Sequence, residues 1–137
     1  LSDKGEALLL QEGADQNSTD RLKTDLLMAG HHGSRHSSTS HWLKTLAPEQ
    51  IVFSSGYLNR FNFPNDQVLQ RIEQVNATLA NESPDHRPIQ WWNTACSGAL
   101  SFKMTQKGIV LLEEYRKSQS KWYHHRCLDS QKGQLFQ

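Results

Sequence analysis

The amino-acid sequence predicts an α/β fold, in which helices alternate with short strands and pack against them in layers. Two observations predict this class. Segments with helically spaced apolar residues alternate with short runs rich in β-branched and aromatic residues, and polar, turn-forming stretches separate the two kinds of segment. The expected strands are too few to form a sheet that is covered independently on both faces, so the sequence also predicts one half of a larger domain.

Five strands are expected from the short apolar runs, and three helices from apolar periodicity and capping residues. The strands are expected at residues 24–29, 50–55, 89–93, 97–104 and 108–112. The helices are expected to begin at Ser2, within residues 37–40, and at Asn65 or Asp66. Pro48 ends the second helix. The first strand is a short, mainly apolar run whose length suits a buried strand, so we expect it to be buried.

Length, charge and cysteine content limit the classes of protein that this chain can represent. Its 137 residues suit one domain or part of one. A net charge of +1 excludes a uniformly basic nucleic-acid-binding chain, although residues 116–132 are basic. No run of about 18 apolar residues is present, so the sequence predicts no membrane span within it. Cys96 and Cys127 are too few for a disulfide scaffold, and we expect two buried thiols; a single disulfide is the alternative in an oxidising compartment.

Two adjacent histidines, His31 and His32, follow the first expected strand and precede Gly33. Ligands bind at the carboxyl ends of strands in α/β sheets, and imidazole nitrogen suits Zn²⁺, Mn²⁺ or iron. Successive side chains of a strand point to opposite faces, so both histidines reach one ion only if the strand has already ended. We therefore expect one metal ligand and one hydrogen-bonding or proton-transfer group. The alternative is that His31 and His32 are loop histidines, each satisfied by hydrogen bonds. A second pair, His124 and His125, follows no expected strand, and we expect it to be solvated.

Aromatic and cationic side chains give weaker candidates. Side chains near the same sheet edge that could contact phosphates or stack on bases are Arg35, His36, Tyr57, Arg60 and Phe61. Trp42 falls on the apolar face of the second helix, so we expect it in the core. Of the neighbouring Trp91 and Trp92, one is expected in the core and the other on the opposite face of the sheet.

The ordered set of motifs from the first strand onwards resembles that of ComEC-type competence proteins. Residues 26–38, which contain His31-His32-Gly33-Ser34, are similar to the His-His-Gly-Ser segment of that family. Residues 54–64 are similar to its Ser-Gly and Asn-x-aromatic-x-His-Pro segment, except that Phe63 stands in place of the histidine. Residues 92–94 and 98–100 are similar to its Thr and Gly-Ala-Ile segment. The resemblance covers most of residues 1–126.

The resemblance implies the metallo-β-lactamase αββα sandwich, with residues 1–113 as its C-terminal half and residues 114–137 as a basic tail. It also implies two divalent transition-metal ions, Zn or Mn, and hydrolysis of phosphodiesters. The family's ligand-rich His-x-His-x-Asp-His motif and its Gly-Asp aspartate lie upstream of Leu1. We therefore expect this chain to be a piece of a longer protein. By itself it is expected to supply only some of the ligands of one ion and to be inactive. Asp3 is expected to be a first-turn helix residue rather than that aspartate.

Residue roles follow from the same resemblance and from charge near the expected cleft. The resemblance gives His32 the role of metal ligand and His31 a catalytic role facing the substrate phosphate. The expected substrate-binding residues are Ser34, Arg35, Asn59 and Arg60. Phe63 cannot bind a metal, donate a proton or contact phosphate by charge. Either catalysis is impaired at this position, or the position is peripheral and Phe63 simply packs.

The sequence thus predicts part of a metal-dependent, nuclease-like hydrolase domain of a bacterial DNA-uptake protein that serves natural transformation. The alternatives are a catalytically degenerate DNA-binding module of the same machinery and another phosphodiesterase of the metallo-β-lactamase fold. The expected partners are single-stranded DNA, the missing N-terminal half of the domain and the membrane channel part of the parent chain, with no small-molecule cofactor. The family implies the bacterial inner membrane, with this domain on the outward, periplasmic face.

Overall fold

The computed structural model describes residues 2–14 and 22–122, which form a mixed α/β arrangement. The helices are α1 (Asp3–Ala14), α2 (Ser40–Leu46), α3 (Asp66–Glu82), α4 (Thr94–Ser97) and α5 (Tyr115–Ser118), with a 3-10 turn, η2 (Gly30–Gly33). The strands are β1 (Leu26–Met28), β2 (Gln50–Phe53), β3 (Gln90–Asn93), β4 (Leu100–Thr105) and β5 (Gly108–Glu114). The predicted α/β class is confirmed, and the metallo-β-lactamase sandwich remains a prediction.

Two sheets are present in the described part of the chain. Strands β1, β2 and β3 pair in parallel in that order, and β4 and β5 form a separate antiparallel hairpin. All four residues of the central strand β2 are buried, whereas β1 is only partly covered and Met28 is 59% exposed. The expectation that the first strand is buried is therefore wrong, because β1 lies at the edge of this sheet rather than inside it.

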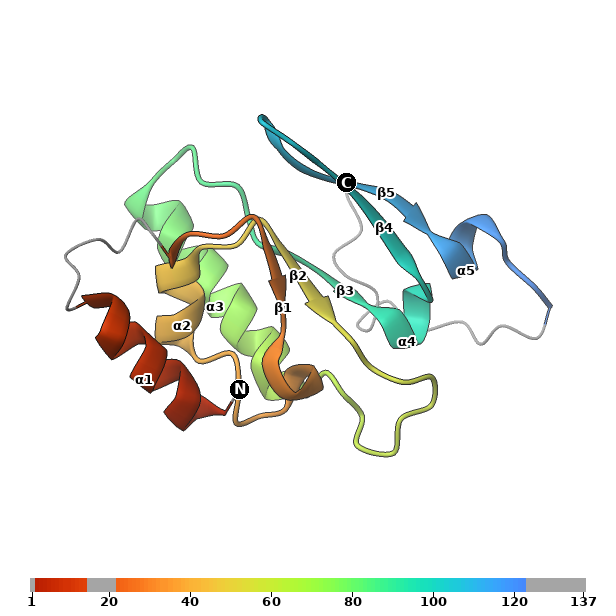
Figure 1. Cartoon of the computed structure of the whole chain (residues 1–137), viewed down its shortest axis with the longest axis horizontal. Coiled ribbons are helices and arrows are strands. Elements are labelled where there is room, and N and C mark those ends of the chain that lie inside the picture. Colours follow the sequence, from red (N-terminus) through yellow and green to blue (C-terminus); the bar gives the residue numbers. More distant parts are fainter. Residues whose placement is uncertain (1, 15–21, 123–137) are drawn as a thin grey trace.

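The main core lies between the parallel sheet and the helices. Figure 1 shows α1, α2 and α3 gathered on one side of this sheet and the β4–β5 hairpin on the other. Helix α3 places one apolar face on the sheet, because its buried residues recur at helical spacing. The buried core residues include Leu43 from α2, Ile51 and Phe53 from β2, Val68, Ile72 and Val75 from α3, and Trp91 from β3.

The neighbouring tryptophans of β3 lie on opposite faces of the sheet, as predicted. Trp91 packs in the main core, with its ring centroid 6.0 Å from that of Phe53. On the other face, Trp92 Nε1 donates a hydrogen bond of 2.6 Å to Gln50 Oε1. Trp42 is also buried, as expected, and packs with Leu10 in a second cluster between α1 and α2. Strand alternation and helix periodicity therefore predicted these burial patterns correctly.

A buried carboxylate joins α1 to the beginning of α2. Glu6 is only 1% exposed, and its two carboxylate oxygens accept hydrogen bonds from Ser38 N at 2.6 Å and Thr39 N at 2.8 Å. Thr39 is the N-cap of α2 and accepts a hydrogen bond from Trp42 N at 3.2 Å. A carboxylate at a helix N-terminus satisfies free N–H groups and interacts favourably with the helix dipole. Glu6 thereby fixes the segment that follows the two histidines.

The last elements differ from the sequence-based boundaries. Residues 94–97 form the short helix α4, so β4 begins at Leu100 rather than at residue 97. Asn93 caps α4 by accepting a hydrogen bond from Ala95 N at 2.9 Å, and this local bond competes with continued strand. Residue 113 lies inside β5, and Arg116 in α5 donates a hydrogen bond to the carbonyl oxygen of Ala95. The division into a domain ending at 113 and a basic tail remains a prediction, and residues 123–137 lie outside the described residues.

Cys96, in α4, is half-buried and disulfide-bonded. The expectation of buried, unpaired thiols is therefore wrong for Cys96, because its sulfur is paired, as in the single disulfide given as the alternative. Cys127 lies outside the described residues, as do His124 and His125. Within residues 2–14 and 22–122, no helix is both long and apolar enough to cross a membrane.

Candidate functional site

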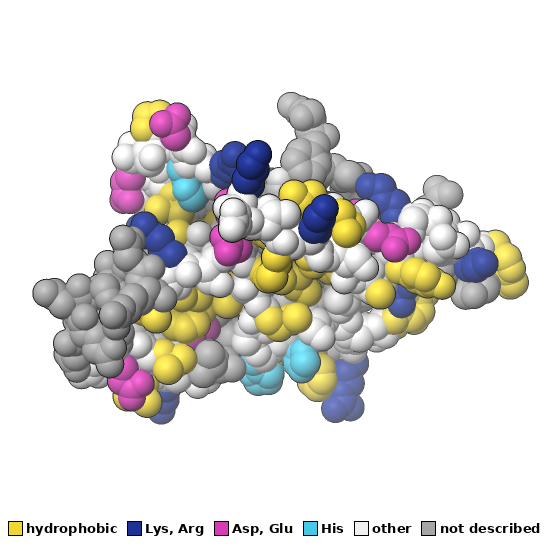
Figure 2. Space-filling view, turned by 45° about the horizontal axis from the view of Figure 1, so that its top comes forward, with side chains coloured by type: hydrophobic (Ala, Val, Ile, Leu, Met, Phe, Trp, Pro, Cys, Tyr) yellow, Lys and Arg dark blue, Asp and Glu magenta, His cyan; other side chains and the backbone are white. Residues whose placement is uncertain are grey.

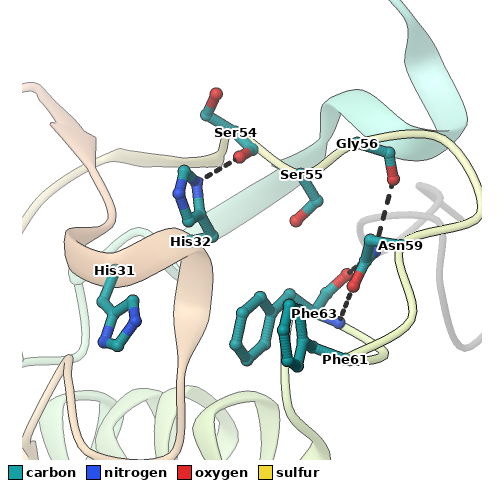
Figure 3. A pocket seen from close by; sticks show the side chains of 8 residues that line it. All are labelled: His31, His32, Ser54, Ser55, Gly56, Asn59, Phe61 and Phe63. Carbon is teal, nitrogen blue, oxygen red and sulfur yellow. Dashed lines mark hydrogen bonds between the residues drawn. The ribbon is translucent and has the colours of Figure 1, made fainter.

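The candidate site lies where the three parallel strands end. The η2 turn follows β1, residues 54–56 follow β2, and Thr94 follows β3. The carboxyl edge of a parallel sheet is where ligands are expected to bind, because loops open there above the strands. A pocket of about 260 Å³ is found at this edge (Figure 3). It is lined by His31, His32, Ser54, Ser55, Gly56, Asn59, Phe61 and Phe63.

The two histidines lie in a tight turn with left-handed backbone. Strand β1 ends at Met28, and the φ angles of His31 and His32 are 48° and 57°. Left-handed conformations are uncommon for residues other than glycine and often mark functional turns. Because the strand has ended, strand alternation no longer separates the two side chains, and both line the same pocket. The structure thus meets the condition under which both rings can face one site.

Gly33 completes this turn and holds it against the core. Its φ is +83°, and a Cβ atom placed on it would lie 2.6 Å from the Phe53 ring and 2.8 Å from Pro64 Cβ. Gly33 also accepts a hydrogen bond of 2.9 Å from Asn65 N through its carbonyl oxygen. The absence of a side chain therefore lets the histidine turn approach the core directly.

A backbone carbonyl orients the ring of His32. His32 Nδ1 lies 2.6 Å from the carbonyl oxygen of Ser54 (Figure 3). A carbonyl oxygen only accepts hydrogen bonds, so Nδ1 carries the proton, and the neutral ring has its lone pair on Nε2. Metal-binding histidines are commonly held in this way, with one nitrogen bonded to a carbonyl and the other free for the ion. His32 is therefore oriented as a metal ligand would be.

Phe63 lies beside both imidazoles. Its ring centroid is 6.1 Å from that of His31 and 6.4 Å from that of His32, and it stacks on His32 at an interplanar angle of 23°. Phe61 stacks on Phe63 in turn, with centroids 5.4 Å apart and an interplanar angle of 20°. The position at which the resembling family has histidine therefore carries an apolar ring that packs against the predicted metal ligand.

Asn59 lines the pocket and braces the loop that forms one of its walls. Its Nδ2 donates hydrogen bonds to the carbonyl oxygens of Gly56 at 3.3 Å and Phe63 at 3.1 Å. Its Oδ1 accepts a hydrogen bond of 2.7 Å from Phe63 N. The side-chain amide thus holds Phe63 in position. A direct contact between Asn59 and substrate remains a prediction.

The other predicted substrate-binding residues lie outside the pocket wall. Ser34 is buried, and its Oγ accepts a hydrogen bond of 3.4 Å from His36 N. Arg35 is exposed, and its Nε donates a 2.9 Å hydrogen bond to His36 Nε2. Arg60 is exposed next to the wall, with its guanidinium 4.7 Å from the centroid of Phe61. The structure therefore brings His31, His32 and Asn59 together and places Arg60 next to them, but not Ser34 or Arg35.

Ser54 and Ser55 were not singled out from the sequence, yet both line the pocket. Ser55 is 8% exposed, and its Oγ has no hydrogen-bond partner among the described residues. Its backbone N–H donates to Thr94 Oγ1 at 2.9 Å, which fixes the residue at the end of β2. The available signal was the position of both serines directly after a strand, at the sheet edge where the histidines were already expected.

The described residues supply one oriented imidazole but not a complete metal site. They contain no cluster of three or more His, Cys, Asp or Glu side chains that could hold an ion. His32 Nε2, which has no hydrogen-bond partner among the described residues, fits a metal ligand, and His31 is the second imidazole of the pocket. Asp3 lies in the first turn of α1 and not in the pocket wall, as expected. Figure 2 shows histidine, hydrophobic and Lys or Arg side chains next to one another along its lower edge.

Comparison with curated proteins finds similarity to competence proteins. The chain is 26% identical over 129 residues to Recombination protein 2 of Haemophilus influenzae, covering 90% of this chain and 15% of that protein. It is 33% identical over 88 residues to Competence protein ComA of Neisseria gonorrhoeae, covering 64% of this chain and 11% of that protein. It is 34% identical over 68 residues to ComE operon protein 3 of Bacillus subtilis, covering 48% of this chain and 9% of that protein.

The chain is therefore homologous to competence proteins, at low identity, and spans at most 15% of the length of these three relatives. No protein-family model matches the sequence. No solved structure matches it either.

Proposed function

We propose that this chain is part of a metal-dependent phosphodiester hydrolase domain in a bacterial DNA-uptake protein. The names of the relatives support a role in natural transformation. The observation that carries the hydrolase proposal is the bond between His32 Nδ1 and the Ser54 carbonyl oxygen, because it leaves Nε2 free at the carboxyl edge of a parallel sheet. The proposed metal is zinc or manganese, which both accept imidazole nitrogen.

In this proposal His32 holds one ion through Nε2, and the remaining ligands come from the longer protein. When bound, a pair of divalent ions supplies hydroxide at neutral pH and stabilises charge on the attacking and leaving oxygens. His31 lies beside His32 in the pocket and orients the scissile phosphate. Arg60, exposed at the wall, attracts the DNA backbone by charge. The Asn59 amide keeps the loop that carries these groups in place.

The proposed setting is that of the longer competence proteins. Single-stranded DNA is the substrate, and the N-terminal half of a metallo-β-lactamase sandwich covers the exposed edge of the described fold. A membrane channel in the same protein passes the strand. The protein lies in the bacterial inner membrane, with this domain on the periplasmic face.

The experiment that tests the hydrolase proposal measures metal content and cleavage of single-stranded DNA in the full-length protein. We expect bound zinc or manganese and cleavage in the wild type, and loss of both in His32→Ala. His41→Ala is the matched control, because His41 is an exposed histidine of α2 that does not line the pocket. A wild-type protein that folds but holds no transition metal would contradict the hydrolase proposal.

A second candidate function is a DNA-binding module without catalysis, and Phe63 favours it. Its ring occupies the space beside both imidazoles, at the position where a polar histidine is expected from the resemblance. If this substitution has removed turnover, Phe63→His is expected to create or raise nuclease activity. If the wild type cleaves DNA and Phe63→His does not cleave it faster, Phe63 has only a packing role.

A further inference from the structure

We propose that the pocket beside His32 receives one unpaired nucleobase of a DNA single strand, stacked on Phe61 and Phe63. This inference rests on the proposed function in DNA uptake. It adds to that function a site that grips the bases of the strand, next to the groups that would act on its phosphates. The domain would consequently prefer single strands to duplex.

The pocket wall is a set of nearly parallel rings. Phe61 and Phe63 stack at 20° and Phe63 and His32 at 23°, with ring centroids 5.4 Å and 6.4 Å apart. Figure 3 shows the two phenylalanine rings side by side in the wall. Phe61 is 58% exposed, so a ligand can reach its ring. Aromatic side chains in such positions stack on bases of single-stranded nucleic acids, because every base presents a flat π-face.

The pocket also offers a hydroxyl that the described residues leave without a hydrogen bond. Ser55 is more than nine-tenths buried, lines the pocket, and its Oγ makes no hydrogen bond within the described part of the chain. A buried polar atom without a partner is costly and calls for an explanation. A hydroxyl both donates and accepts, so it can pair with the polar edge of any base.

Charge around the pocket suits a polyanion. None of the eight residues that line it is acidic. The exposed guanidinium of Arg60 lies over the Phe61 ring, 4.7 Å from its centroid, so it must swing aside for a base to stack there and can then meet the phosphate of the same nucleotide. In duplex DNA each base is already stacked and paired, so it can reach these rings only at the cost of leaving the helix. An unpaired base carries the smaller cost.

The test compares three labelled oligonucleotides of equal length by fluorescence anisotropy, with a chelator present to prevent cleavage. They are an oligothymidylate, an abasic oligomer with the same phosphates, and a duplex. The full-length protein is expected to bind the oligothymidylate most tightly. Phe61→Ala is expected to weaken that binding roughly 5- to 150-fold, the range for a lost base-stacking ring, and to leave abasic binding unchanged. Ser55→Ala is expected to weaken it by a smaller factor.

Leu58→Ala is the matched control, because Leu58 lies in the same loop, is 71% exposed and does not line the pocket. Equal affinity for the oligothymidylate and the abasic oligomer would overturn the base-binding inference while leaving DNA binding intact. Base-dependent binding that Phe61→Ala does not weaken would overturn it as well, because the bases would then be held elsewhere. If the folded protein binds none of the three oligonucleotides, the proposed function in DNA uptake is itself contradicted. Because Phe61 is exposed, its replacement is not expected to unfold the protein.

Discussion

Replacing Gly33 with alanine is expected to destabilise the protein strongly, because two independent penalties meet at this residue. The added Cβ would lie 2.6 Å from one ring carbon of Phe53, 2.8 Å from a second, and 2.8 Å from Pro64 Cβ. Real Cβ atoms do not approach other atoms so closely, so the core must move. Phe53 is fully buried beneath the turn, and its ring therefore cannot swing into solvent.

The magnitude follows from these two terms. Overpacking a well-packed core costs about 1–3 kcal/mol. A left-handed backbone costs an L-residue roughly 1–2 kcal/mol, and Gly33 has a φ of +83°. The smaller conformational entropy of an unfolded chain with alanine offsets less than about 1 kcal/mol. The expected loss in the free energy of unfolding is therefore about 1–5 kcal/mol, and the His32 ring is expected to shift with the turn.

The assay is urea unfolding followed by tryptophan fluorescence, which reports on the buried side chains of Trp91 and Trp92. Gly56→Ala is the matched control, since no atom lies within 4 Å of a Cβ placed there. That variant is expected to stay within about 0.5 kcal/mol of the wild type. Equal stabilities for Gly33→Ala and Gly56→Ala would refute the reasoning, because they would mean that the close approach to Phe53 is not a constraint.

Three further substitutions test hydrogen bonds within the fold. Glu6→Gln is expected to lower the free energy of unfolding by about 1–3 kcal/mol, because the NH2 group of glutamine would replace one of the two carboxylate oxygens that accept hydrogen bonds from Ser38 N and Thr39 N. Glu12→Gln, on the exposed side of α1, is the control and should be neutral in the same urea assay. Asn65→Ala is expected to cost about 1 kcal/mol by removing the N-cap of α3, and an unchanged thermal midpoint would argue against capping. Trp92→Phe leaves Gln50 Oε1 without its 2.6 Å donor and is expected to cost about 1–3 kcal/mol, which calorimetry can check.

Local patterns in the sequence predicted most of the helices and strands. Helix α3 begins at Asp66 after the cap Asn65, as the capping residues and apolar spacing indicated. The run at residues 50–55 contains β2, whose four residues are all buried. These features depend on neighbours a few residues apart, so they can be found without the fold. The start of β4 was misplaced because a four-residue helix, α4, depends on a local cap that strand propensity does not register.

The site was predicted in part for the same reason. The position of His31 and His32 after an apolar run was enough to place them at the carboxyl edge of a sheet. Ser34 and Arg35 follow them directly in sequence, yet the loop turns their side chains towards His36 and away from the pocket. Adjacency along the chain therefore did not translate into adjacency in the site.

The sequence by itself determined the α/β class, the elements with strong periodicity, and the edge of the sheet where the two histidines gather. The tertiary structure decided which groups meet at that edge. The Ser54 carbonyl that orients His32 lies 22 residues away along the chain, and the hydroxyl of Ser55 and the rings of Phe61 and Phe63 join it from the following loop. Periodicity records which face of an element is apolar, whereas these contacts depend on how separate elements are brought together. Only the folded chain fixes that arrangement.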